Sequence, residues 1–238
     1  MTAIGGLLFD KDGTLFDFLA TWGSWTRDLI GDLSRGGPPG LGERLGAAAG
    51  YDLSTGRFAP DSPIIAHTPG DIAAVLLPLL PGRSLAELVG RMNALSALAG
   101  QVEAVPLRPL FARLRARGLR LGVATNDAEG PARAHLSRAG IAGLVDFVAG
   151  CDSGWGAKPA PGPLFAFASR VGLRPAEVAM VGDSRNDLVA GRAAGMRTVG
   201  VLTGPAGHAE LAPLADVVLP DIGHLPGWLD GLAVAAGA

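Results

Sequence analysis

The chain has 238 residues, of which 48% are hydrophobic and 18% are charged, and its formal net charge is −2. This balance excludes an intrinsically disordered chain, which needs low hydrophobicity and high charge. It also gives no reason to expect a nucleic-acid partner or a basic membrane-binding surface. Because the length exceeds one typical domain of about 150 residues, we expect a core domain that contains an insertion.

The chain contains one cysteine, Cys151, which excludes an internal disulfide and fits a reducing compartment. The first residues have no basic flank, and the first apolar run ends at Asp10, so we expect no secretory signal peptide. No apolar stretch is long enough for a membrane span. We therefore predict a cytoplasmic protein without membrane association.

Short apolar runs without polar alternation recur along the chain, as they do in the buried strands of a parallel sheet. Amphipathic stretches of helix length lie between them, several ending in a glycine, which is a common helix stop. This alternation predicts an α/β fold with a doubly wound, Rossmann-like parallel sheet. The predicted strands are 4–9, 121–124, 145–149, 178–181, 198–201 and 217–219, and the predicted core helices are 109–118, 132–140, 163–172 and 188–195.

The interval between residues 16 and 102 breaks this alternation, because it contains no convincing strand. It predicts helices at 19–33, 41–50, 71–79 and 84–100, with turn signals between them such as Gly36-Gly37-Pro38-Pro39 and Pro81-Gly82. We therefore predict two domains: a core formed by residues 1–15 and 103–238, and an inserted α-helical domain formed by residues 16–102.

Asp10 and Asp12 directly follow the first predicted strand. In open α/β sheets, ligands bind beyond the carboxyl ends of the strands, so this is a favourable place for a site. One carboxylate of such a pair can act as a nucleophile and the other as a general acid or base. The alternative is a surface turn, for which Asp-Gly is a common pair.

Three further groups of polar residues follow at the same edge of the predicted sheet. Thr125 and Asn126 could bind a phosphate oxygen or simply cap a helix. Lys158 could pair with a phosphate or be a solvated loop residue. Asp183 and Asp187 offer oxygen ligands suited to Mg²⁺, or Asp183 or Ser184 could cap a helix. Together the four groups provide what a phosphoryl-transfer site requires.

With these residues in view, the sequence resembles the haloacid dehalogenase-like hydrolases, and within them the phosphoglycolate phosphatase-like branch. The resemblance rests on four motifs in order and covers nearly all of the core, whereas the helical insert matches in position and type only. The motifs are FDKDGTL at 9–15, ATN at 124–126, KPAP at 158–161 and VGDSRND at 181–187.

The resemblance implies a Mg²⁺-dependent phosphatase that hydrolyses a small phosphorylated metabolite. Asp10 would attack phosphorus to form an aspartyl-phosphate, and Asp12 would protonate the leaving alcohol and then activate water. Thr125, Asn126 and Lys158 would bind the phosphoryl oxygens. Mg²⁺ would be held by Asp10, the backbone carbonyl of Asp12 and Asp183, with Asp187 in or near this set. The helical insert would be a cap that closes over the site.

Two residues depart from the family pattern. Lys11 stands where a bulky apolar residue is usual, and it could be either a second phosphate-side charge or a solvent-facing substitution. Phe18 stands where serine is frequent, and together with Phe16, Trp22 and Trp25 it predicts an aromatic cap entrance. Such a wall favours substrates other than phosphoglycolate, a very small dianion; alternatively, these aromatics pack the cap helices together.

Several alternatives stay open at this point. A sugar-phosphate mutase of the same fold would use nearly the same motifs, and the chain could be a monomer or a homodimer. Arg35, Arg57 and Arg83 lie in or near cap loops and could reach a second anionic group on a substrate. The four histidines have no metal-ligand spacing, so we expect surface or capping roles for them.

Overall fold

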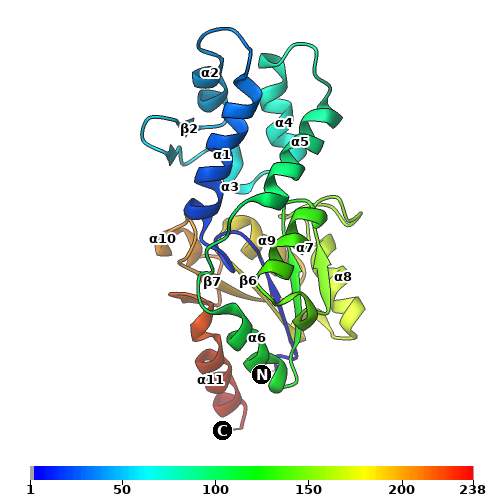
Figure 1. Ribbon diagram of the computed structural model, residues 1–238. Helices are drawn as coiled ribbons and strands as arrows, with labels where there is room; N and C mark the ends of the chain where they lie inside the picture. Colours follow the sequence, from blue (N-terminus) through cyan, green and yellow to red (C-terminus); the bar gives the residue numbers. More distant parts are fainter. Residues whose placement is uncertain (1–2, 238) are drawn as a thin grey trace.

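Within residues 3–237, which the computed structural model describes, six parallel strands form one sheet in the order β5-β4-β1-β6-β7-β8 (Figure 1). Every strand predicted from the apolar runs is present. The sheet runs outward in both directions from β1, so its topological switch point lies between β1 and β6. The strands are β1 (Gly6–Phe9), β4 (Arg120–Ala124), β5 (Phe147–Ala149), β6 (Val178–Gly182), β7 (Arg197–Val201) and β8 (Val217–Leu219).

Helices cover both faces of this sheet, which explains why its strands lack polar alternation. In β1, Leu7 and Phe9 join the apolar cluster on one face, and Leu8 joins the cluster on the other. The predicted core helices are confirmed, with shifts at their ends of up to three residues. The core helices are α6 (Leu107–Ala116), α7 (Glu129–Arg138), α8 (Gly162–Val171), α9 (Arg185–Ala193), α10 (His208–Leu211) and α11 (Leu225–Gly237), with short 3-10 helices η2 (Ala142–Leu144), η3 (Pro175–Glu177) and η4 (Ile222–His224).

The inserted helical segment, which we call the cap, lies beyond the carboxyl edge of the sheet, at the top of Figure 1. Its helices pack around an apolar cluster of their own that includes Trp25, Leu45 and Leu88. The cap helices are α1 (Phe18–Ser34), α2 (Leu41–Ala48), α3 (Pro63–Ala66), α4 (Pro69–Leu76) and α5 (Leu85–Leu98), with the 3-10 helix η1 (Leu77–Leu79) after α4.

The expectation that the insert lacks strands is wrong in one detail. A small antiparallel pair, β2 (Tyr51–Asp52) and β3 (Arg57–Phe58), lies between α2 and α3. The Asp52 side chain accepts hydrogen bonds from the backbone N–H and the hydroxyl of Ser54 and so fixes the turn between the strands. Two-residue strands are too short to produce a periodic pattern, so they cannot be predicted from the apolar spacing.

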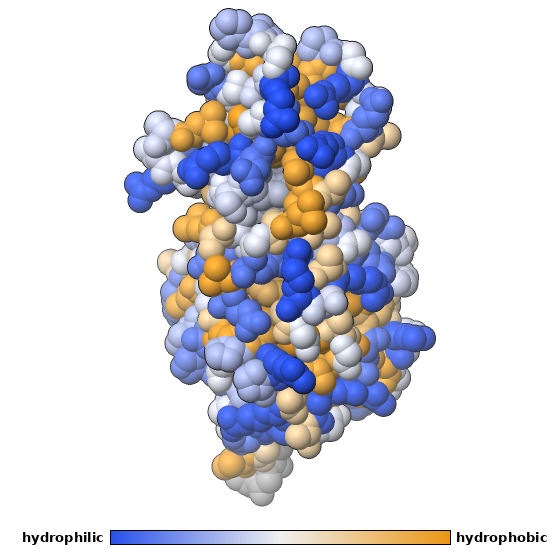
Figure 2. Space-filling model, in the orientation of Figure 1, coloured by the Kyte–Doolittle hydropathy of each residue, from blue (hydrophilic) through white to orange (hydrophobic). Residues whose placement is uncertain are grey.

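The chain enters and leaves the cap through two adjacent segments. The backbone N–H of Asp17 donates to the carbonyl of Val102 over 2.8 Å, and the N–H of Ala104 donates to the carbonyl of Leu15 over 2.9 Å. Figure 2 shows hydrophobic residues at the surface where the cap and the core meet. The two connections therefore hold the cap directly above the ends of β1 and β6.

Across the described residues, no helix combines the length and the apolar character needed to cross a lipid bilayer.

Two phenylalanines of α8 provide a matched test of the packing. Phe167 is fully buried against the sheet, whereas Phe165 on the same helix is 46% exposed. We expect Phe167→Ala to lower the free energy of unfolding by about 3–5 kcal/mol, because it leaves a cavity in the core. Phe165→Ala should lower it by less than about 1 kcal/mol. Urea unfolding measures both, and equal losses would contradict the described packing.

Candidate active site

The polar residues identified in the sequence gather at the switch point of the sheet. Asp10 follows β1, Asp183 follows β6, and Thr125 follows β4, so that three neighbouring strands each end in a residue of one site. Clefts of open α/β sheets form where the strand order reverses, because the connections on either side run in opposite directions there. The topology alone therefore brings together residues that lie far apart in the sequence.

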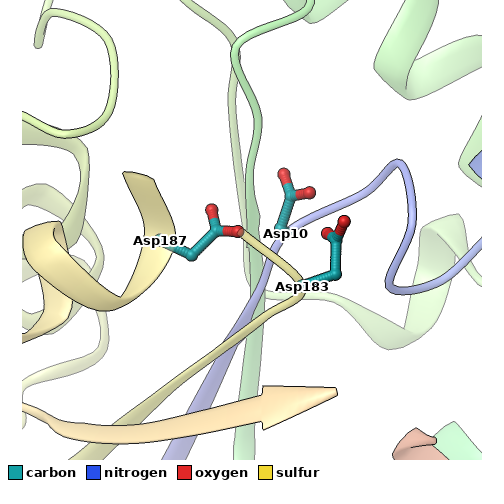
Figure 3. A group of neighbouring side chains, drawn as sticks. All are labelled: Asp10, Asp183 and Asp187. Carbon is teal, nitrogen blue, oxygen red and sulfur yellow. The ribbon is translucent and has the colours of Figure 1, made fainter. Parts of the chain in front are cut away.

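Three buried carboxylates form the centre of the site. Asp10, Asp183 and Asp187 each offer an oxygen, and these three oxygens lie within 4.8 Å of one another. Figure 3 shows Asp10 and Asp183 projecting from the ends of their strands and Asp187 from the first turn of α9. A compact set of carboxylate oxygens suits a hard divalent cation such as Mg²⁺.

Neighbouring residues fix Asp183 in place. The Thr14 hydroxyl donates to Asp183 Oδ1 over 3.1 Å. A Cβ at Gly13 or at Gly204 would lie within 2.5 Å of the Asp183 carboxylate, so glycine is needed at both positions. The Asp183 carboxylate thus packs directly against the backbone at Gly13 and Gly204, where there is no room for a side chain.

Asp187 is oriented by the start of its own helix. Ser184 is the N-cap of α9, and Asp187 Oδ2 accepts hydrogen bonds from the Ser184 backbone N–H over 3.0 Å and from the Ser184 hydroxyl over 2.6 Å. This is a capping box, in which two side chains satisfy backbone groups of the first turn reciprocally. The other oxygen, Oδ1, remains directed at the site.

Lys158 joins two of the three carboxylates. Its Nζ lies 2.6 Å from Asp10 Oδ1 and 2.6 Å from Asp187 Oδ1. Burial alone would lower the pKa of Lys158, but the carboxylates of Asp10 and Asp187 outweigh it and hold the pKa above its ordinary value. Lys158 is therefore a permanent cation inside the site, not a solvated loop residue.

The pKa values of Asp10 and Asp183 lie above those of exposed carboxyl groups. Burial raises the pKa of Asp10 to about 7, against the lowering effect of Lys158 and with a further increase from Asp187. Burial also raises the pKa of Asp183 well above its ordinary value, and the charges of Asp10 and Asp187 add to this. One lysine does not neutralise three carboxylates, so a second cation would stabilise their ionised forms.

Thr125 and Asn126 have different surroundings. The Thr125 hydroxyl accepts a hydrogen bond from the Asp127 N–H over 3.1 Å and keeps its own proton free to donate. The Asn126 side chain is already engaged, because Oδ1 accepts from the Lys158 N–H and Nδ2 donates to the Lys158 carbonyl, over 2.9 and 2.8 Å. Asn126 thus fixes the loop that presents Lys158.

Asp12 lies beside this cluster but not in it. Its carboxylate faces Lys11, whose Nζ lies 2.7 Å from Asp12 Oδ2 and 3.1 Å from Asp127 Oδ2. Burial raises the pKa of Asp12, with Lys11 acting in the lowering direction. Burial therefore favours the protonated form of the Asp12 carboxyl, whereas the adjacent Lys11 ammonium favours the ionised form.

Lys11 matches neither of the roles considered for it. The side chain is fully buried and is not solvent-facing. Its Nζ contacts Asp12, Asp127 and His135 Nδ1, the last over 3.0 Å, and Lys11 does not line the cavity that contains the three-carboxylate cluster. The cation is instead held behind Asp12, where the carboxylates of Asp12 and Asp127 raise its pKa against the lowering effect of burial.

His135 extends this network to the cap. Its Nε2 lies 2.7 Å from the Ser96 carbonyl of α5, and the Ser96 hydroxyl donates to Asp127 Oδ2 over 3.2 Å. An ammonium group can only donate and a carbonyl can only accept, so His135 carries its proton on Nε2. The expectation of a surface or capping role is wrong for His135, which is fully buried.

The sequence contained a partial signal for His135. It follows Ala132 by three residues and precedes Leu136, both of which lie on the buried face of α7. That spacing predicts an inward direction. No comparable signal identified Asp127 or Ser96, because each acquires its role only from contacts with residues more than 30 positions away in the chain.

Comparison with known proteins agrees with this geometry. The sequence profile of the haloacid dehalogenase-like hydrolases matches residues 4–195. The chain belongs to this family. A phosphoglycolate phosphatase from Yersinia pseudotuberculosis is 31% identical over 246 aligned positions, which cover 96% of this chain and 97% of that protein. The similarity to the phosphoglycolate phosphatase-like branch of the haloacid dehalogenase-like hydrolases is thereby confirmed.

Two further matches define how far the similarity extends. A phosphoglycolate phosphatase from Rhodospirillum rubrum is 39% identical over 120 residues, so the chain spans about half the length of that relative in the match. The crystal structure of a predicted phosphoglycolate phosphatase from Haemophilus somnus superposes with a TM-score of 0.70 at 20% identity, covering 95% of this chain and 98% of the other. This last similarity shows that the haloacid dehalogenase-like fold is shared.

The buried pair of Lys11 and Asp127 gives a stability prediction. Lys11→Met leaves two buried carboxylates without their cation, and we expect it to lower the free energy of unfolding by about 3–5 kcal/mol. Lys11→Met combined with Asp127→Asn should recover part of this loss. The control is Arg91→Met, which removes a partly exposed pair with Asp32 and should cost no more than about 1 kcal/mol. Equal losses in urea unfolding of Lys11→Met and Arg91→Met would contradict the network.

His135 gives a pH prediction. Burial, with a smaller effect from the Lys11 charge, lowers its pKa from 6.5 to about 4. Between these pH values the unfolded chain binds more protons than the folded one, so this group makes the folded state more stable as pH rises. We expect an NMR titration of His135 with a midpoint near pH 4, and His135→Gln should weaken the rise in stability over this window. A midpoint near pH 6.5 would contradict the assignment.

Proposed function

We propose that this protein is a Mg²⁺-dependent phosphatase that hydrolyses a small phosphomonoester, similar to phosphoglycolate phosphatases. The observation that supports this most directly is the position of Asp10, whose carboxylate lies at the switch point beside Asp183, Asp187 and Lys158. We also propose that residues 16–102 act as a cap domain over a hydrolase core formed by residues 1–15 and 103–238.

The proposed mechanism has two displacements at phosphorus. An Asp10 oxygen attacks phosphorus as the ester P–O bond breaks, and the Asp12 carboxyl donates its proton to the departing alkoxide. A water molecule then attacks the aspartyl-phosphate, gives a proton to the Asp12 carboxylate, and displaces Asp10. Inorganic phosphate leaves, and Asp10 and Asp12 return to their starting states.

The remaining residues bind and balance charge. Lys158 would pair with the phosphoryl oxygens, and Thr125 would donate its hydroxyl proton to one of them. Asn126 would act through its backbone N–H and through the position of the Lys158 loop. Phosphoryl transfer depends more on such positioning and electrostatic stabilisation than on special covalent chemistry.

The donor set fits the proposed cation. Asp10, Asp183 and the backbone carbonyl of Asp12 would hold Mg²⁺, which when bound neutralises the phosphoryl charge and orients the group for in-line attack. Asp187 has one oxygen on Ser184 and the other on Lys158. Its main part in holding the cation is therefore to position Lys158 and to add negative charge.

The test measures phosphate release from p-nitrophenyl phosphate and small alkyl phosphates with Mg²⁺. Asp10→Asn should lower the rate at least about 10³-fold, because it removes the nucleophile. Asp61→Asn makes the same chemical change at an exposed cap residue and should leave the rate unchanged. EDTA should abolish release and Mg²⁺ should restore it.

Three outcomes would contradict the proposal. Wild-type activity of Asp10→Asn would remove the assigned nucleophile, and full activity in EDTA would exclude the metal. Phosphoryl transfer between sugar phosphates without release of inorganic phosphate would favour a sugar-phosphate mutase of the same fold.

A further inference from the structure

The cavity above the three-carboxylate cluster has two chemically different ends. At the core end it contains the carboxylates and Lys158, and the cap forms the opposite wall; the solvent-accessible volume between them is about 60 Å³. A phosphoryl group at the core end would place the alcohol portion of a substrate against the cap wall. The chemistry of this wall therefore determines which alcohols the site accepts.

The cap wall is mainly apolar. Three aromatic side chains of α1 contribute to it, together with aliphatic side chains from α3, α4 and α5. Trp22 and Trp25 pack edge to face, with ring centroids 4.8 Å apart, so their surfaces are held rigidly. The residues of this apolar wall are Phe18, Trp22, Trp25, Ile64, Ile72 and Met92.

The cavity as a whole is strongly acidic. Five aspartates and a single lysine, Lys158, line it, and among the described residues no arginine does. The cap arginines considered for a second anionic group, Arg35, Arg57 and Arg83, are exposed and lie outside the lining. Apart from Lys158, only the exposed His67 could bring positive charge to the wall.

A substrate with a second negative charge would meet this wall at a cost. Lys158 and a bound cation are needed for the phosphoryl group, which leaves no permanent cation for a carboxylate at the other end. Moving an unpaired carboxylate from water to an apolar surface is strongly unfavourable, and ionised aspartates at the core end of the cavity would add repulsion. A neutral alcohol incurs neither cost.

Two polar groups of the wall lack partners. Trp25 and Asn93 both line the cavity, and Trp25 Nε1 and Asn93 Oδ1 are buried without a hydrogen-bond partner among the described residues. Buried donors and acceptors are almost always paired in native proteins. The chain therefore leaves one donor and one acceptor beside the cavity without a partner, and neither of them is a charged group.

We propose that the site acts on phosphomonoesters of uncharged, largely apolar alcohols and discriminates against those with a second anionic group, phosphoglycolate included. This inference rests on the proposed phosphatase function and specifies its substrate class. The expected substrates of this chain therefore differ from phosphoglycolate, the substrate in the names of the relatives from Rhodospirillum rubrum and Yersinia pseudotuberculosis. The apolar wall favours the body of the alcohol, and the absence of a free cation among the described lining residues disfavours a second negative charge on it.

The experiment compares two substrate pairs that differ in charge at one end. One pair is phosphoglycolate and its methyl ester; the other is 6-(phosphonooxy)hexanoate and hexyl phosphate. We expect kcat/KM to be at least about tenfold higher for the neutral member of each pair, because the charged one loses solvation without gaining a partner. Equal or higher kcat/KM for the charged members would overturn the inference while leaving the phosphatase proposal intact.

A pair of lysine substitutions tests whether the apolar wall causes the preference for neutral substrates. Ile65 lies partly buried in the cavity lining, whereas Val75 is 43% exposed on α4 and outside it. Ile65→Lys should shift the kcat/KM ratio towards the charged members by about tenfold, and Val75→Lys should leave it unchanged. An unchanged ratio in Ile65→Lys, with folding verified by circular dichroism, would overturn the role of the wall.

The two proposals fail in distinguishable ways. Release of phosphate from none of the four esters, by folded protein supplied with Mg²⁺, would overturn the phosphatase function and this inference with it. Release from all four without a charge preference would overturn only the substrate class.

Discussion

The mutual repulsion of three carboxylates buried within 4.8 Å of one another is the constraint on which the rest of the site depends. Such a group is unfavourable unless cations and hydrogen-bond donors surround it. Lys158 supplies one cation, and Thr14 and Ser184 supply donors. The remaining negative charge is what a bound divalent cation would balance. In the proposed account, the arrangement is tolerated because binding compensates for its cost.

The parallel sheet makes this concentration of charge possible. Its strands end at one edge, and the reversal of strand order between β1 and β6 opens space for side chains that follow them. Glycines at the closest approaches, Gly13 and Gly204, let the backbone surround Asp183 without steric conflict. The apolar clusters on both faces hold the strands in register. The packing of the core therefore also fixes the positions of the site residues that follow the strands.

A second charged network lies behind the first and connects the core to the cap. Lys11 pairs with Asp12 and Asp127, and His135 links Lys11 to the Ser96 carbonyl of α5. Ala66, at the end of α3, makes a second contact between the cap and the core. Its carbonyl accepts hydrogen bonds from the side chains of Asn126 and Asn186 over 3.0 and 3.3 Å. The proposed acid/base and phosphate-binding residues are thus in direct contact with groups that hold the cap.

Much of the fold and of the candidate site could be predicted from the sequence. The features that could not be predicted depend on contacts formed only in the folded chain. Apolar runs identified every strand of the six-stranded sheet, and the motifs after them identified Asp10, Thr125, Lys158 and Asp183, because strand ends and the loops that follow them share one edge. The direction of Lys11 could not be predicted, since it depends on Asp127 and His135, which are more than 110 residues away. The chemistry of the cap wall could not be predicted either, because helical periodicity does not distinguish a residue that packs from one that also lines a cavity.

In the proposed mechanism, Asp10 is phosphorylated during turnover. Acid quenching of the enzyme during hydrolysis of a phosphomonoester with Mg²⁺, followed by peptide mass spectrometry, tests this step. We expect a peptide heavier by one phosphoryl group, with the modification on Asp10, that disappears when the substrate is exhausted. Rapid phosphate release with no phosphorylated residue, or with the phosphoryl group on a residue other than Asp10, would show that Asp10 is not the nucleophile.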